Sequence, residues 1–186
     1  MKIESRWTFS ILVFLITFIV YVITCAPNVM FTDNGELAGV CATLGVAHPT
    51  GYPLFTILGY LWTLLPLPFS TIYSLNLFAA FVTAVSGMVF FNVVCTVFEQ
   101  LNEKSVSKPA KQDKRKSKKK KAEPKKTVKL TTGNILMVSL GAALAYSFAA
   151  TVWEQGTSLE VYSLHLLLMN LILLTFLNGI FNNSKK

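Results

Sequence analysis

Residues 31–53, FTDNGELAGVCATLGVAHPTGYP, contain the side chains of this sequence that are best suited to chemistry. Asp33 and Glu36 supply two carboxylates and His48 supplies an imidazole, in a stretch without lysine or arginine. Long apolar segments lie on both sides of it. A carboxylate near a low-dielectric boundary has a raised pKa, which improves it as a general base near neutral pH. The composition therefore indicates general-base catalysis or metal binding at a membrane face.

Two further carboxylates, Glu154 and Glu160, lie in the stretch TVWEQGTSLEVY. The topology derived below places all four carboxylates near one membrane face. Helix capping is the competing interpretation. Asp33 with Glu36, and Thr157 with Glu160, both have the spacing of a capping box. The residues alone leave the two interpretations open.

Histidines and aromatic residues near the same face are the remaining candidates. His48 suits either a buried, hydrogen-bonded histidine or a contact to phosphate and sugar. Tyr52, Trp153 and Tyr162 suit the aromatic belt of a membrane interface, or stacking on a sugar. His165 lies within an apolar segment, where we expect a neutral imidazole bonded to a neighbouring helix. The three cysteines, which lack metal-ligand spacing, are Cys25, Cys41 and Cys95. No metal ligand is assigned.

The composition is that of an integral membrane protein. Of the 186 residues 53% are hydrophobic and only 14% are charged, with a mean hydropathy of +0.53. Soluble domains carry about 25% charged residues. Thirteen of the 17 lysines and arginines fall between Lys104 and Lys129. The net charge of +8 is thus local, and we expect no nucleic-acid partner.

Apolar runs predict about four transmembrane helices. The predicted spans are residues 7–24, 72–98, 133–150 and 159–181. A cleaved signal peptide is the rival interpretation of the first. A helix is expected to begin near Asp33 and to end at His48-Pro49, because proline disfavours helix in the residue before it. Residues 52–65 are expected to form a helix that dips into the outer half of the membrane, and residues 151–158 a short outer loop. The predicted fold is therefore all-α integral membrane, with an outer-face interfacial or re-entrant helical segment.

Charge sets the expected orientation, because cytoplasmic loops carry the excess of lysine and arginine. It predicts cytoplasmic N- and C-termini. Residues 1–98 would form a membrane region with a first outer loop and interfacial helices over 26–71. Residues 99–130 would form a lysine-rich, disordered cytoplasmic loop that contacts lipid headgroups, and residues 131–186 a two-helix membrane hairpin. We expect a bacterial inner membrane rather than an endoplasmic-reticulum membrane.

The stretch TDNGEL, followed by LGVAHPTGYPLF, resembles the N-terminal signature of a family of large multi-pass membrane proteins. That signature reads roughly DSGE and then LGVAHPPGYPL. A second family stretch, roughly F-W-x-Q-A-x-x-A-E-V-Y-x-L, is similar to residues 152–164 of this chain. The family was long described as a domain of unknown function. Its animal member is a transmembrane protein O-mannosyltransferase, and the resemblance implies a glycosyltransferase of the GT-C superfamily.

The resemblance also implies roles for individual residues. The donor would be a sugar linked to polyprenyl phosphate, used on the outer or lumenal face. Asp33 would deprotonate an acceptor hydroxyl, which attacks the sugar C1 with inversion, and Glu36 would assist. His48 and Tyr52 would lie near the donor. The remaining substrate-binding residues implied are Glu154, Glu160 and Tyr162.

The chain departs from the family in length, since family members have roughly ten or more spans. No lysine or arginine lies on the predicted outer face, and a leaving phosphate needs positive charge or a divalent metal. We therefore expect a fragment, a separately encoded N-terminal subunit or a degenerate copy, completed by another multi-pass membrane chain. The alternative function is a small non-catalytic membrane subunit that scaffolds an envelope complex or binds a lipid-linked glycan.

Overall fold

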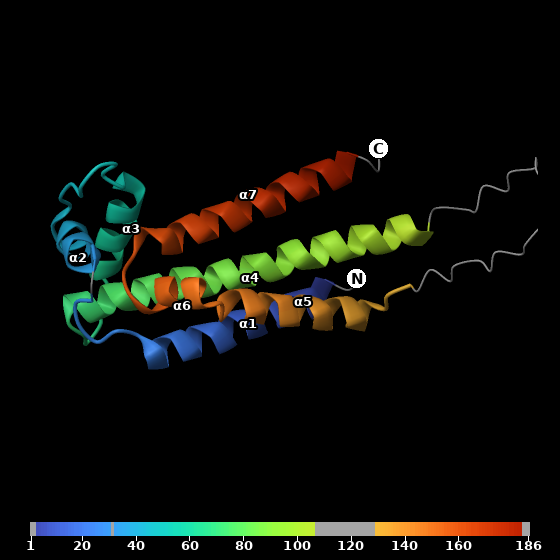
Figure 1. The fold of residues 1–186 in the computed structure, drawn as a ribbon, viewed down its shortest axis with the longest axis horizontal. Coiled ribbons are helices and arrows are strands. Elements are labelled where there is room, and N and C mark those ends of the chain that lie inside the picture. Colours follow the sequence, from blue (N-terminus) through green and yellow to red (C-terminus); the bar gives the residue numbers. More distant parts are fainter. Residues whose placement is uncertain (1–2, 31, 107–128, 184–186) are drawn as a thin grey trace, which may run out of the picture.

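The computed structural model describes residues 3–30, 32–106 and 129–183. Within these ranges every regular element is an α-helix (Figure 1). The helices are α1 (Ile3–Thr24), α2 (Asn34–Thr43), α3 (Pro53–Thr63), α4 (Thr71–Val106), α5 (Thr132–Ser147), α6 (Ala150–Thr157) and α7 (Val161–Asn183). The prediction of an all-α protein is confirmed.

Three helices, α1, α4 and α7, are each long and apolar enough to cross a membrane. Helix α5 is shorter, and α6 follows it at a bend of 66°. The bent pair passes the same test when it is taken as one span, so the described residues supply three or up to four crossings. This agrees with the predicted number of about four.

Helix α4 is the centre of the molecule, and Figure 1 shows it running nearly the whole length of the described fold. In the most apolar 18-residue stretch of α4, 67% of the residues are buried. The corresponding shares are 22% for α1 and 11% for α7. Helices α1, α5, α6 and α7 all pack against it. Helices α2 and α3 lie at one end of the long axis, and the N and C labels lie toward the other (Figure 1).

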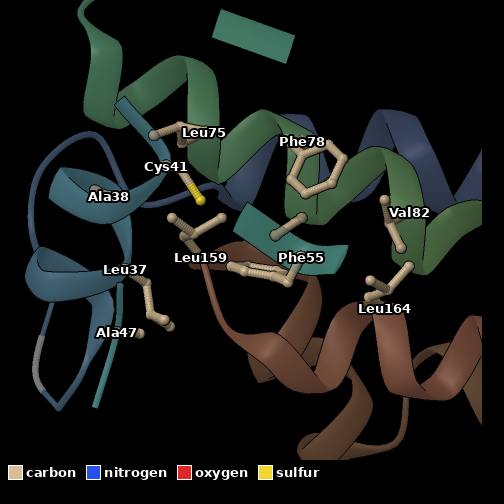
Figure 2. Close-up of a cluster of buried hydrophobic side chains, with 11 residues drawn as sticks. Leu37, Ala38, Cys41, Ala47, Phe55, Leu75, Phe78, Val82, Leu159 and Leu164 are labelled. Carbon is tan, nitrogen blue, oxygen red and sulfur yellow. The ribbon is translucent and has the colours of Figure 1, made fainter. Parts of the chain in front are cut away.

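A cluster of buried apolar side chains fixes α2 and α3 to the long helices (Figure 2). Leu37 and Cys41 of α2 and Phe55 of α3 pack against α4, while Leu159, just before α7, closes the cluster. The indole N–H of Trp62 donates to the Ser74 carbonyl at 2.8 Å, which ties α3 to α4. The two short helices are therefore held by packing within the chain.

Helix α2 ends earlier than its sequence predicts. Its last residue is Thr43, and Leu44 adopts the left-handed conformation with φ of 51°. The Gly45 N–H then donates to the Val40 carbonyl at 3.0 Å, which closes the helix end. The predicted end at His48-Pro49 is wrong, because the left-handed residue stops the helix before the proline does.

The predicted outer loop over residues 151–158 is also wrong, because most of it forms α6. Ala149 is extended between α5 and α6, and the Trp153 N–H donates to its carbonyl at 2.9 Å. Gly156 lies against the ring of Tyr21, and the Tyr21 hydroxyl donates to the Ser147 carbonyl at 2.6 Å. Packing on α1 thus stabilises this short helix of eight residues.

At the opposite end, α4 continues to Val106, so residues 99–106 are helical rather than loop. Arg6 pairs with Glu99 at 3.3 Å and donates to Asn92 and Thr96 of the same helix. The Asn102 side chain bonds the backbone of Leu130 in both directions, at 2.9 and 3.0 Å. These contacts extend α4 beyond its apolar run. The rest of the predicted lysine-rich loop, residues 107–128, lies outside the described residues.

Candidate functional site

His48 lies between the two carboxylates of the first acidic pair. Its backbone N–H donates to Oε1 of Glu36 at 2.8 Å, and its Nδ1 lies 3.1 Å from Oε2 of the same carboxylate. On the other side of the ring, Nε2 lies 3.8 Å from Oδ2 of Asp33. The arrangement is a carboxylate–imidazole–carboxylate cluster, which we call the Asp33–His48–Glu36 cluster.

The cluster is partly open to its surroundings. The side chains of Asp33, Glu36 and His48 are 49%, 45% and 37% exposed. A substrate hydroxyl can therefore approach these groups without unfolding of the loop. Partial exposure also means that the ion pairs contribute little to stability by themselves.

The capping-box interpretation of Asp33 and Glu36 is wrong. Asp33 occupies the N-cap position of α2, but its side chain makes no capping hydrogen bond. Its backbone has ψ of 0°, outside the extended region that a capping side chain normally needs. The Glu36 carboxylate bonds His48 instead. Neither carboxylate is occupied by the helix start.

The second proposed box is wrong as well. Thr157 is the last residue of α6, and its hydroxyl donates to the Trp153 carbonyl at 3.1 Å. Helix α7 begins only at Val161, after Glu160. Glu160 is therefore free of the capping role that its sequence position suggested.

Surroundings move two of the carboxyl pKa values in opposite directions. The hydrogen bond from the His48 backbone N–H, with a smaller contribution from its ring, lowers the pKa of Glu36. Burial raises the pKa of Glu160, and the negative charges of Asp33 and Glu154 raise it further, while His48 opposes them. Glu160 thus interacts electrostatically with Asp33 and His48 of the cluster, and Glu154 interacts with Glu160. Neighbouring carboxyl groups whose pKa values are shifted in opposite directions are typical of acid and base pairs in active sites.

The loop that carries His48 has an unusual backbone. All the non-glycine residues with positive φ among the described residues fall in this part of the chain: Thr32, Leu44 and Tyr52. Gly51, with φ of 84°, precedes Tyr52. The Tyr52 ring meets the His48 ring edge-on, with centroids 5.5 Å apart. Such conformations cost about 1–3 kcal/mol each and tend to cluster at functional sites.

A groove of about 350 Å³ adjoins the same loop. Its lining is mostly apolar and comprises Leu44, Gly45, Val46, Thr50, Gly51, Pro53, Thr56 and Ile57. The Thr56 hydroxyl is buried there, with no hydrogen-bond partner among the described residues. The groove can accept a hydrocarbon chain beside the cluster.

Tyr162 is directed elsewhere. Its side chain is largely exposed, and it lines a second groove of about 210 Å³ with His165 and Gln155. This groove lies between α6 and α7 rather than at the cluster. Among the predicted site residues, Asp33, Glu36, His48 and Tyr52 come together directly, whereas Glu160 interacts with Asp33 and His48 only electrostatically.

The three residues of the cluster are also the donors that could hold a divalent cation. One ligand atom from each lies within 4.8 Å of the others. The carboxylates, however, face opposite nitrogens of the ring. A single cation bound at one nitrogen would therefore require one carboxylate to move.

The cysteines are not candidate nucleophiles. Cys25 and Cys41 are buried, and burial raises the pKa of each thiol to about 11. All three cysteines are free. Protonated buried thiols of this kind are inert.

Two buried residues next to the cluster were not among the predicted site residues. Asn34 and Asn76 are fully buried amides that bond each other at 3.0 Å. The only available signal was their polar character, since Asn76 lies in an apolar run and Asn34 directly follows Asp33.

Comparisons with known proteins point to one family. Residues 33–185 match the model of the protein O-mannosyl-transferase TMEM260 N-terminal domain. The chain is similar to protein O-mannosyl-transferase TMEM260 of Mus musculus, with 30% identity over 165 residues, covering 88% of this chain and 18% of that protein. It is also similar to protein O-mannosyl-transferase tmem260 of Dictyostelium discoideum, with 49% identity over 53 residues, covering 28% of this chain and 6% of that protein. No solved structure matches.

The chain thus spans less than a fifth of the length of these relatives, at 18% and 6%. Both relatives are eukaryotic, so they give no support to the expected bacterial membrane. The matched region contains every residue of the cluster and both later glutamates. Helices able to cross a membrane and the similarity to these relatives identify an integral membrane protein. The chain belongs to the family defined by the protein O-mannosyl-transferase TMEM260 N-terminal domain.

Proposed function

We propose that this chain forms the N-terminal part of an O-mannosyltransferase of the GT-C type, which uses a polyprenyl-phosphate-linked sugar as donor. The observation that carries the proposal is the Asp33–His48–Glu36 cluster, in which partly exposed carboxylates flank one imidazole. The protein O-mannosyl-transferase names of the relatives supply the reaction class.

Asp33 would act as the general base. It would accept the proton of the acceptor hydroxyl as that oxygen forms a bond to C1 of the sugar. The bond between C1 and the phosphate oxygen breaks, and the phosphate leaves with the electron pair. Attack from the side opposite the phosphate inverts the anomeric carbon. Glu36 would hold His48 in place through its 2.8 Å contact with the backbone N–H, so that the ring stays beside Asp33.

The donor would bind on the α3 side of the cluster. The apolar groove along Leu44, Val46 and Ile57 suits the start of a polyprenyl chain, and Tyr52 would lie near the sugar. The leaving phosphate needs a positive charge. No lysine or arginine lies between Arg6 and Lys104, so we propose that a partner chain or a divalent cation supplies it.

The site would face the outer or lumenal side of the membrane. Helices α2 and α3 lie opposite the end toward which both termini point, and α4 leads from them toward the lysine-rich segment (Figure 1). The positive-inside rule places that segment in the cytoplasm. We further propose that another multi-pass membrane chain packs on α7. Only 11% of the residues in the most apolar stretch of this helix are buried.

The test is purification of the tagged chain from its native membrane in mild detergent, followed by mass spectrometry of the associated proteins. The purified assembly is then assayed for transfer of radiolabelled mannose from a polyprenyl-phosphate mannose to a serine- and threonine-containing peptide. Transfer together with a co-purifying multi-pass chain supports the proposal. An assembly without transfer, bound instead to unrelated membrane machinery, would favour a non-catalytic subunit that scaffolds a complex or binds a lipid-linked glycan.

A further inference from the structure

Two amide side chains, Asn34 and Asn76, meet in the interior at the end of the molecule that carries the cluster. Both are completely buried. The Asn34 Nδ2 donates to the Asn76 Oδ1 at 3.0 Å and to the Leu159 carbonyl at 3.3 Å. The Leu159 N–H donates to the same Asn76 oxygen at 2.9 Å. The amide pair therefore joins α2 and α4 to the connection that precedes α7.

The same pair also holds the loop after α1. The Asn76 Nδ2 donates to the carbonyls of Ala26 and Asn28, at 2.8 and 3.3 Å. The Met30 N–H donates to the Asn34 Oδ1 at 3.0 Å. Every polar atom of the two side chains thus has a partner. One pair of amides thus connects three stretches that are distant in the sequence: residues 26–34, helix α4 and the connection before α7.

This pair lies next to the carboxylates of the site. Asp33 directly precedes Asn34, and Glu160 directly follows Leu159. Asp33 and Glu160 therefore flank the two residues that are bonded to the Asn76 Oδ1, and the Asp33 charge contributes to the raised pKa of Glu160. Fixing Asn34 and Leu159 to one oxygen leaves little freedom for their neighbours. Packing alone resists sliding poorly, whereas hydrogen bonds fix direction and register.

We propose that Asn34 and Asn76 are positioning residues, which hold Asp33, directly before α2, and Glu160, directly before α7, in fixed positions. The catalytic consequence rests on the proposed function, whereas the geometric claim does not. Removal of Asn76 would leave the buried Leu159 N–H without its acceptor and the Asn34 Nδ2 with only its 3.3 Å bond to the Leu159 carbonyl, which is costly. The structure would relieve this by moving α2 away from the start of α7.

The chain offers a matched control in Asn170 of α7. This amide is 5% exposed and donates to the Ser86 hydroxyl at 2.9 Å and the Tyr146 hydroxyl at 3.0 Å. It joins α7 to α4 and α5 within the helix bundle. Asn170→Leu therefore removes a buried amide network of the same kind without touching α2.

The experiment measures the distance between spin labels at residues 39 and 151, introduced as genetically encoded amino acids in the full chain in nanodiscs. Gly39 has open space around its Cβ position, and Thr151 is exposed. We expect Asn76→Leu to broaden the distance distribution at least about twofold, because α2 loses its directional contacts, and Asn170→Leu to leave it unchanged. If Asn76→Leu does not accumulate, Asn76→Asp is used, which keeps one oxygen for Leu159 but loses the donors to Ala26 and Asn28.

An unchanged distribution in the Asn76 variant, or equal broadening in Asn170→Leu, would overturn the proposal. A measurement of mannosyl transfer by the same variants tests the proposed function separately from the positioning claim. We expect Asn76→Leu to lower kcat for mannosyl transfer by about 10²-fold with a much smaller change in KM. Broadening in Asn76→Leu alone, combined with a wild-type chain that shows no transfer, would refute the proposed function and retain the positioning claim.

Discussion

The pKa values of Glu160 and Glu36 are shifted in opposite directions by their surroundings. Burial raises the pKa of Glu160, whereas hydrogen bonds from His48 lower the pKa of Glu36. For Glu160 the folded state binds the proton more tightly than the unfolded state, so stability falls as the pH rises from the unfolded value of about 4.3 through the raised folded value. For Glu36 the sign is reversed, and its stabilisation is lost as the pH falls through its lowered pKa.

We therefore expect Glu160→Gln to raise Tm at pH 7 by about 1–2 °C, because it removes a charge that is disfavoured in the folded state. The gain should vanish near pH 3, where Glu160 is protonated in both states. Glu36→Gln is the matched variant of opposite sign and should lower Tm at pH 7. Thermal unfolding in detergent across this pH range measures both. Equal shifts of the two variants at every pH would contradict the electrostatic account.

The sequence named Asp33, Glu36 and His48 as candidate site residues but could not show how they pair. Asp33, Glu36 and His48 lie close together along the chain, and the structure brings them together in space. Their pairing depends on the helix end at Leu44, where a left-handed residue turns the chain back so that His48 reaches Glu36. A leucine in that conformation leaves no sequence signal, because glycine or asparagine is the usual residue there.

At the scale of the helices, the site depends on the packing of α3 against α2. Gly59 of α3 lies so close to Cys41 that an added Cβ would be 2.5 Å from the sulfur. The sulfur belongs to the buried apolar cluster of Figure 2, which also contains Phe55 and Leu159. The two helices can therefore approach only because residue 59 has no side chain.

Gly59→Ala should destabilise the chain by about 1–3 kcal/mol, because the methyl group overpacks a core that cannot expand freely. Gly39→Ala is the control, since nothing lies within 4 Å of its Cβ position, and it should be neutral or stabilising by about 0.5–1 kcal/mol. Denaturant unfolding in detergent compares the two. The packing account would fail if both variants had the same stability.

The helices that could be predicted from the sequence are those with a long apolar run. Apolar runs located α1, α4 and α7, although α4 continues to Val106, well beyond its predicted end at residue 98. Helix α6 was missed because it has only eight residues and is stabilised by contacts with Tyr21 and α4. The extended Ala149 separates it from α5. Asn34 and Asn76 could not be paired without knowing that their helices touch.

At the scale of the whole molecule, charge is separated along the long axis. The Asp33–His48–Glu36 cluster lies at the end formed by α2 and α3, and no lysine or arginine lies between Arg6 and Lys104. The lysines are concentrated in the segment that begins at Lys104. This separation is the basis for the proposed orientation.

Single cysteines test that orientation. A membrane-impermeant maleimide applied from the outer or lumenal side should label Ser70→Cys, in the connection between α3 and α4, because this residue is exposed and lies beyond residues 52–65. Lys129→Cys should react only after the membrane is permeabilised. The three native cysteines are buried and serve as the unlabelled background. The reverse pattern of labelling would invert the proposed topology and would place the cluster in the cytoplasm.

The proposed function requires Asp33 to act as the base of a mannosyl transfer. The most direct measurement is the transfer rate from a polyprenyl-phosphate mannose by the purified assembly carrying Asp33→Asn, which keeps the shape of the side chain but cannot accept the proton. Glu4→Gln, a carboxyl at the start of α1, is the control. We expect Asp33→Asn to lower the rate by about 10²–10⁴-fold, with assembly and Tm retained, and Glu4→Gln to have no effect. A wild-type rate in a folded Asp33→Asn assembly would contradict the account.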